Sequence, residues 1–213
     1  MGKPILAVVL IFILYLISNK KFIFLNRNYT KKECGDIGER IVSNILYNLD
    51  DRYVVENDLR FDGIQIDHIV EYENIVFVIE TKKWSGKVTG RKNDAKWCQN
   101  KRGCLEYYKN PIKQNEMHIS RLKIREIGKY IVRNDENYED RNCDEYENMR
   151  DKEYVNIVVF VENRNVPKLK NVIQEYELYD YIRGYVSKVN KVDNRVNKVS
   201  CGNKNVSYGR CDL

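Results

Sequence analysis

The sequence predicts an α/β fold in which a mixed central sheet is flanked by helices and preceded by one transmembrane helix. Three observations carry this prediction. An apolar segment stands near the N-terminus, short apolar runs of β-strand character follow it, and segments with helical periodicity separate those runs. A chain of 213 residues can bury a core of ordinary size, and a charged fraction of 32% alongside abundant apolar residues argues against general disorder.

The N-terminal segment is apolar from Pro4 to Ser18, and Asn19-Lys20-Lys21 separates it from the short run FIFL. The first run is shorter than the ~20 residues of a usual span, but lysines can reach the interface, so residues 4–25 can cross together. Basic residues are more numerous after the segment, which places the following chain in the cytoplasm. A signal peptide is the alternative, but no small-x-small cleavage site follows. Residues 1–32 are therefore predicted to be a single-pass anchor in the cell membrane with a basic linker.

The first elements after the anchor follow from periodicity. CGDIGERIVSNILYNL, from Cys34 to Leu49, has apolar residues at helical spacing and predicts an amphipathic helix. YVVENDLRF predicts a first strand, with Asp62-Gly63 as a turn. IQIDHIV and NIVFVIETK are the clearest strands, and a second helix is expected from Ile112 to about residue 131, with Met117 and Ile127 among its core contacts.

The C-terminal third is predicted to complete the domain over residues 132–190. Acidic residues dominate from Asn134 to Glu153, which indicates an exposed insertion. YVNIVVFVEN is apolar nearly throughout and predicts an internal strand, and a final helix is expected from Leu178 to Val189. Residues 191–213 are basic and poor in core residues, so they are predicted to be a mobile tail.

Cysteines and net charge limit the function classes. The six cysteines form no C-x-x-C pair and the chain has only two histidines, so a structural zinc site has little support. Free thiols in a reducing compartment are favoured over pairing or metal binding by the two tail cysteines. A net charge of +6 is compatible with a nucleic-acid or anionic-membrane partner and does not distinguish between them.

Two carboxylates stand near the ends of the two clearest strands. If Glu73-Asn74 forms a two-residue hairpin turn, the register that closes it places Asp67 opposite Glu80. Lys82 then shares their face, because strand side chains alternate. Facing carboxylates repel each other, and a divalent cation between them relieves this; oxygen ligands suit Mg²⁺ or Mn²⁺. The alternative interpretation is a structural salt bridge at a strand end.

The order of motifs resembles the NERD (nuclease-related) domain, a family placed in the PD-(D/E)xK nuclease-like superfamily. The motifs are GER on the first helix, QID, ETK followed by WSG, and NP with Gln114 and His118 on the second helix. The resemblance covers about residues 33–131 and implies a restriction-endonuclease-like core. Some members carry an N-terminal membrane segment; others carry a C-terminal zinc ribbon, whose paired C-x-x-C ligands this chain lacks.

The resemblance also implies site residues and chemistry. The residues that match Asp67 and Glu80 bind the metal in the superfamily, and the residue that matches Lys82 orients the water or stabilises the transition state. Glu39 matches a helix glutamate of some members, which adds a ligand or holds a water. Gln114 matches a glutamine that often lines the site. The implied reaction is phosphodiester hydrolysis, with DNA favoured over RNA.

Cationic residues with interleaved aromatics follow the candidate site directly. The residues expected to contact the phosphate backbone are Lys83, Trp84, Lys87, Arg91 and Lys92. Three alternatives remain: a solvated face, contact with anionic lipid near the anchor, and for Trp84 an aromatic that anchors the exit of the strand.

The sequence thus predicts a membrane-tethered, metal-dependent nuclease whose domain lies in the cytoplasm. The alternatives are a non-catalytic nucleic-acid-binding module and a membrane-bound interaction or scaffold protein. The enzyme and the binding module both predict salt-sensitive nucleic-acid affinity, and only the enzyme needs metal for turnover.

Overall fold

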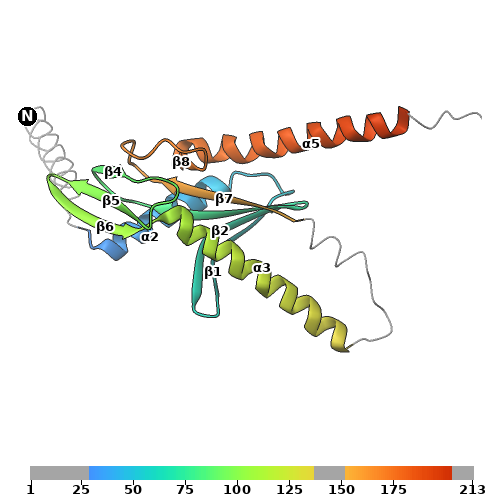
Figure 1. Ribbon diagram of the computed structural model, residues 1–213, viewed down its shortest axis with the longest axis horizontal. Helices are drawn as coiled ribbons and strands as arrows, with labels where there is room; N and C mark the ends of the chain where they lie inside the picture. The colour runs from blue at the N-terminus through green and yellow to red at the C-terminus, as the bar shows by residue number, and fades with distance from the viewer. Residues whose placement is uncertain (1–28, 137–151, 203–213) are drawn as a thin grey trace, which may run out of the picture. The chain divides into compact units, whose positions relative to one another are not determined.

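The larger sheet contains five strands in a mixed arrangement, as the sequence predicts (Figure 1). In spatial order they are β1 (Val54–Phe61), β2 (Ile64–Tyr72), β3 (Ile75–Lys82), β7 (Glu153–Phe160) and β8 (Val172–Gln174). The first three are antiparallel neighbours, whereas β7 runs parallel to both β3 and β8. Strand β3 therefore has a strand on each side, and all its residues except the last are buried.

This computed structural model describes residues 29–136 and 152–202. The chain divides into two compact units, residues 1–36 and 37–213. The predicted membrane segment, residues 4–25, lies outside the described residues. Within the two described ranges, no helix is long and apolar enough to cross a bilayer.

The β2–β3 hairpin has the register that the sequence predicts. Its turn is Glu73-Asn74, and Glu73 has the positive φ, 52°, that such turns need. The ladder runs from the turn to the pair His68–Ile79 and ends there, one pair before Asp67 and Glu80. The strands are thus aligned as predicted, but regular pairing stops just short of the candidate site.

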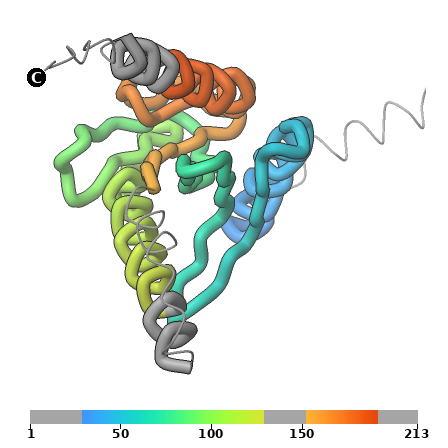
Figure 2. The backbone as a smooth tube through the Cα atoms, turned by 90° about the vertical axis from the view of Figure 1, so that its right-hand side faces the viewer, coloured from blue at the N-terminus to red at the C-terminus, as the bar shows by residue number. Residues whose placement is uncertain are grey.

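Helices cover both faces of this sheet. On one face, residues of α2 (Lys31–Leu46) and α5 (Leu178–Gly202) form the main core with β2, β3 and β7. On the other face, α3 (Pro111–Glu136) packs Leu122 against a second cluster from β1, β2 and β3. Figure 2 shows α3 and residues 37–46 of α2 on opposite sides of the β1–β2 hairpin. The end of β3 is therefore enclosed between helices.

Three antiparallel strands that follow β3 and precede α3 in the chain form a second sheet: β4 (Lys87–Thr89), β5 (Lys96–Lys101) and β6 (Cys104–Lys109). The sequence predicts only a basic segment there. Fully buried Trp97 anchors this sheet against Phe160 of β7, with ring centroids 6.3 Å apart. Gly86 has φ +80° beside the Asn100 backbone, so the turn before β4 needs a glycine.

The start of the first described helix and two core contacts differ from the predictions. Helix α2 begins at Lys31 because Thr30 and Glu33 form a capping box, with Thr30 Oγ1 3.2 Å from the Glu33 amide and Glu33 Oε2 2.9 Å from the Thr30 amide. On α3, Met117 and Ile127 are 49% and 48% exposed, so their prediction as core contacts is wrong.

The C-terminal helix is longer than its composition suggests. Helix α5 continues to Gly202, through half of the segment predicted as a tail. Residues 137–151 of the predicted acidic insertion and residues 203–213 of the tail lie outside the described residues.

Candidate functional site

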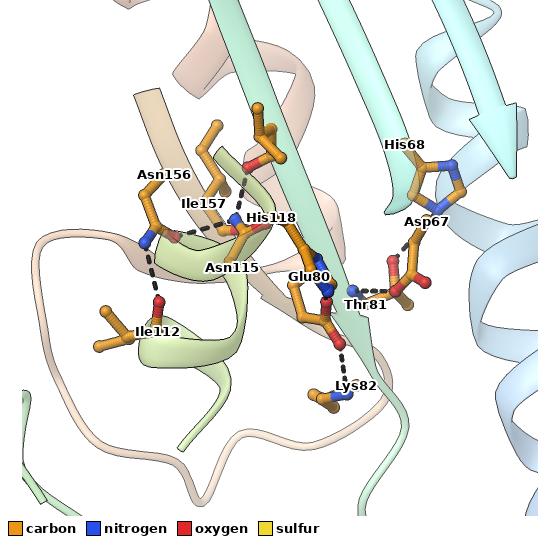
Figure 3. A network of polar contacts seen from close by, with 11 residues as sticks. Asp67, His68, Glu80, Thr81, Lys82, Ile112, Asn115, His118, Asn156 and Ile157 are labelled. Carbon is orange, nitrogen blue, oxygen red and sulfur yellow. Dashed lines mark hydrogen bonds and ion pairs between the residues drawn. The ribbon is translucent and has the colours of Figure 1, made fainter. Parts of the chain in front are cut away.

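Glu80 lies at the C-terminal end of β3 and is 1% exposed. Its carboxylate points towards α3, as Figure 3 shows. The Oε1 atom pairs with the Lys82 ammonium, and the Oε2 atom lies 3.4 Å from Nδ1 of His118. Lys82 also places its Nζ atom 5.9 Å from the centroid of the Trp84 ring.

The contact between Glu80 and His118 is not a hydrogen bond. Both Oε2 of Glu80 and Nδ1 of His118 are buried and make no hydrogen bond to another described residue. Burial, and then the Lys82 charge, lower the pKa of His118, so the imidazole is neutral at pH 7 and the pair is not ionic. Unpaired buried polar atoms are uncommon, and one explanation for them is an additional bound group.

Asp67 lies where two ladders are interrupted. Neither the β1–β2 nor the β2–β3 ladder pairs this residue, and Asp58, the β1 residue opposite it, has φ 55°. Its Oδ2 atom instead accepts a hydrogen bond of 2.8 Å from the Thr81 amide. In Figure 3, Asp67 lies beside Thr81 while Glu80 points towards His118. The two carboxylates flank the end of β3 rather than pairing across the ladder.

The carboxylates nevertheless interact through their charges. Burial, and then the charge of Glu80, raise the pKa of Asp67 to about 7. Burial also raises the pKa of Glu80, against the effect of Lys82, and Glu39 adds to the increase. The site therefore favours fewer negative charges or a nearby cation.

Helix α2 brings Glu39 near this group through close packing at Gly38. A Cβ atom at Gly38 would lie 3.2 Å from Cβ of Lys83 and 3.4 Å from Cγ2 of Thr81. The helix thus approaches the end of β3 so closely that a side chain at this position would press on its neighbours. Glu39, the next residue, is half-buried. The GER motif of the sequence corresponds to this packing.

Asn115 fixes the start of α3 on the sheet. This fully buried residue donates through Nδ2 to the carbonyl oxygens of Val78 and Ile157 at 2.7 and 3.2 Å, and to Oδ1 of Asn156 at 2.9 Å (Figure 3). Gln114 is half-buried one residue earlier. Asn115 is not among the residues predicted from the sequence, although a polar residue with apolar neighbours one helical turn away was a usable signal.

The donor set fits a small hard cation. Within residues 29–136 and 152–202, no three His, Cys, Asp or Glu side chains form a ready-made metal cage. Mg²⁺ is, however, usually bound by one or two carboxylates, with waters and substrate phosphates completing its shell. Asp67 and Glu80 supply such oxygens, and the unpaired Oε2 atom of Glu80 is an available ligand.

The predicted nucleic-acid contacts fall into two groups. Lys83 pairs with Glu162, and Trp84 is half-buried with its ring stacked on Tyr108 at 4.8 Å, so Trp84 does anchor the strand exit. The second group is Lys87, Arg91 and Lys92, which are exposed on β4 and the following loop.

Asn110 holds that loop in place. Its Nδ2 atom lies 3.3, 2.9 and 2.8 Å from the carbonyl oxygens of Arg91, Lys92 and Asp94. The backbone that carries the two exposed cations is thereby fixed to the start of α3.

Sequence comparisons identify a family over the part of the chain that contains this site. The sequence profile of the nuclease-related domain, NERD, matches residues 35–161, which include the five site residues from Glu39 to Gln114 and strand β7. An uncharacterized protein of Bacillus anthracis is 37% identical over 103 residues, 46% of this chain and 49% of the relative. The chain thus spans about half the length of this curated relative. No solved structure matches the chain.

Proposed function

Because the chain belongs to the nuclease-related domain family, we propose that it is a metal-dependent nuclease that hydrolyses phosphodiester bonds, in DNA rather than RNA. One observation carries the proposal. A buried glutamate, Glu80, ends an internal strand with an unpaired oxygen, beside a second carboxylate, Asp67, and a lysine, Lys82.

Asp67 and Glu80 would hold Mg²⁺ or Mn²⁺, whose Lewis acidity neutralises charge on a phosphate and acidifies water. The chain's own groups complete the site. Lys82 carries a positive charge beside Glu80, where it can stabilise the additional negative charge that develops on the phosphate. Glu39 lies close enough to affect Glu80 and would hold a water by hydrogen bonding. Gln114 would line the site from α3.

The second sheet would provide the electrostatic contact with the nucleic-acid backbone. The exposed cations Lys87, Arg91 and Lys92 lie on strand β4 and on a loop that Asn110 fixes. Their backbone is therefore already ordered before nucleic acid binds. Lys83 is paired with Glu162 and would have to exchange partners to bind phosphate.

Residues 4–25 would tether this activity to the cytoplasmic face of the cell membrane. Support comes from the apolar character of that segment and from the excess of lysine and arginine after it. Fractionation of cells that express the full chain, compared with a chain lacking residues 1–28, tests the tether. Release of the domain from the membrane fraction is expected only for the shortened chain.

The test of the proposed activity uses the full chain in detergent. Linear, circular and single-stranded DNA and RNA are incubated with it in Mg²⁺, Mn²⁺ or EDTA. The variant is Glu80→Gln, which keeps the shape of the side chain, and the matched control is Glu71→Gln on β2, whose native carboxylate pairs with Lys152 at 3.4 Å. Cleavage that needs metal, is abolished in Glu80→Gln and persists in the control is the expected result.

Two other outcomes would replace the proposal. Folded protein that binds nucleic acid but does not cleave it would be a non-catalytic binding module. Protein that neither binds nor cleaves would be a membrane-bound interaction protein.

A further inference from the structure

A polar network crosses the face of the sheet opposite Glu80, at the point where the β2–β3 ladder ends. His68, which is 1% exposed, places Nδ1 2.7 Å from Oδ1 of Asn57 and Nε2 3.1 Å from Oγ1 of Thr81. The hydroxyl of Ser43 on α2 lies 3.4 Å from the same Asn57 oxygen. The network therefore joins α2, β1, β2 and β3 at one level of the sheet.

The partners of His68 define its tautomer. The Asn57 oxygen only accepts hydrogen bonds, so the proton of the neutral imidazole is on Nδ1. Nε2 is then an acceptor, and the Thr81 hydroxyl donates to it. Burial lowers the pKa of His68 to about 4, so this neutral form is present throughout the physiological range.

Thr81 belongs to the network and to the candidate site at once. Its side chain bonds to His68, while its amide donates to Oδ2 of Asp67 at 2.8 Å (Figure 3). Residues 67 and 68 of β2 thus hold the same residue of β3 from two directions. Beyond the last regular pair, His68–Ile79, these two side-chain hydrogen bonds take the place of the ladder.

We propose that His68 is a positioning residue: fixed by Asn57, it binds the Thr81 hydroxyl and so keeps the end of β3 where the Thr81 amide orients the Asp67 carboxylate. The catalytic consequence rests on the proposed function; the positioning itself does not. Residues that orient metal ligands typically change metal affinity or activity 10- to 100-fold when they are removed.

Two substitutions at one position test the inference in the full chain. Thr81→Val removes the hydroxyl and keeps the shape of the side chain, whereas Thr81→Ser keeps the hydroxyl and removes the methyl group that packs near Gly38. We expect Thr81→Val to lower kcat by about 10- to 100-fold at nearly unchanged KM. Thr81→Ser is expected to stay within about threefold of the wild type, although it loses the packing of that methyl group.

The unfolding free energies of both variants are measured beside their activities. Activity that follows the hydroxyl and not the unfolding free energy excludes a merely structural role. If both variants instead lose activity in proportion to the unfolding free energy that each has lost, the inference is overturned. Mn²⁺ affinity, measured by electron paramagnetic resonance without substrate, gives a second readout. It is expected to be weaker in Thr81→Val only.

A third readout remains informative if the wild type proves inactive. Nitrogen-15 chemical shifts of His68 in the wild type should show a neutral ring protonated at Nδ1. The amide proton of residue 81 should shift upfield in both Asp67→Asn and Thr81→Val. An Nε2-protonated ring, or an amide shift that Thr81→Val leaves unchanged, would reject the positioning role. An inactive wild type with the expected shifts would reject only the nuclease proposal.

Discussion

Asp67 is the residue whose ionisation should be visible in the stability of the protein. Burial, and then the charge of Glu80, raise its pKa in the folded chain to about 7, whereas a carboxyl of this type in an unfolded chain has a pKa of about 3.9. Between these two values the folded protein binds the proton more tightly. Metal-free folding is therefore favoured at low pH, and the contribution of Asp67 is lost as pH rises through its folded pKa.

Asp67→Asn should remove this dependence. The unfolding free energy of the wild type, relative to the variant, is expected to decrease between about pH 4 and about pH 7 and to level off above that range. Denaturation of both proteins by urea in EDTA at a series of pH values measures it. Glu71→Gln, a substitution elsewhere on β2, should keep the wild-type slope. Parallel curves for the wild type and Asp67→Asn would show that the carboxyl is not perturbed.

At this scale the sequence identified the charged site residues better than their partners. Strand alternation and hairpin register pointed to Asp67, Glu80 and Lys82, although regular pairing ends one pair before Asp67 and Glu80. The contacts of His68 and Asn115 could not be predicted, because a polar residue in an apolar strand, or with apolar neighbours one helical turn away, only indicates burial. Which backbone groups it satisfies depends on helices that arrive from distant parts of the chain.

Helix α2 contains two glycines that face different surroundings. A Cβ atom at Gly38 would press on Lys83 and Thr81, whereas a Cβ atom at Gly35 would meet nothing within 4 Å. Alanine is favoured over glycine inside helices by about 1 kcal/mol. Gly35→Ala should therefore increase stability by up to about that amount, and Gly38→Ala should gain less or lose stability. Urea denaturation of the two variants measures this, and equal gains would show that α2 is not tightly packed on β3.

Asn115 should be the residue on which the attachment of α3 depends. Asn115→Ala leaves the Val78 and Ile157 carbonyl oxygens without this donor, which costs about 1–3 kcal/mol for an unsatisfied buried group. Lys113→Ala, at an exposed position two residues earlier, should cost much less. Thermal or urea unfolding separates the two. Equal losses of unfolding free energy in the two variants would mean that the Asn115 hydrogen bonds make no net contribution to stability.

Elements with strong periodicity were predictable and the second sheet was not. Strands β2, β3 and β7 appear as apolar runs because they are buried. Strand β6 is exposed at all but one position, and the alternation of buried and exposed residues in β4 extends over only three residues. Neither strand therefore has a pattern long enough for the sequence to reveal. The early start of α2 was predictable in principle, because Thr30 and Glu33 have the spacing of a capping box.

For the whole molecule, nucleic-acid affinity should depend on salt through the second sheet. Each phosphate contact contributes a slope of about 0.7–0.9 to the dependence of log K on log salt concentration. Replacing Lys87, Arg91 and Lys92 with Ala should therefore reduce the slope by about 2 to 3. The control replaces three exposed cations elsewhere, Arg121, Lys168 and Lys188. Equal reductions in both proteins would show that binding depends on total charge and not on this sheet.

The motifs that indicate the family cover less of the chain than the family match does. The motif order indicates the NERD family over about residues 33–131, whereas the profile match extends to residue 161 and includes β7. No motif marks β7, because its function is to pair with β3 along the entire length from Ile75 to Lys82. Only the assembled sheet shows that the strand bearing Glu80 needs this distant neighbour.

The parallel pairing of β3 with β7 also has a consequence for biosynthesis. Strand β3 ends at Lys82 and its neighbour ends at Phe160, so at 5–20 residues per second the ribosome needs roughly 4–16 s to supply the second edge. During that time an apolar strand has one open edge, and such edges recruit strands of other nascent chains. Slower initiation or a chaperone that shields this edge should raise the soluble yield. A chain that stops before residue 153 should aggregate rather than give a smaller active domain.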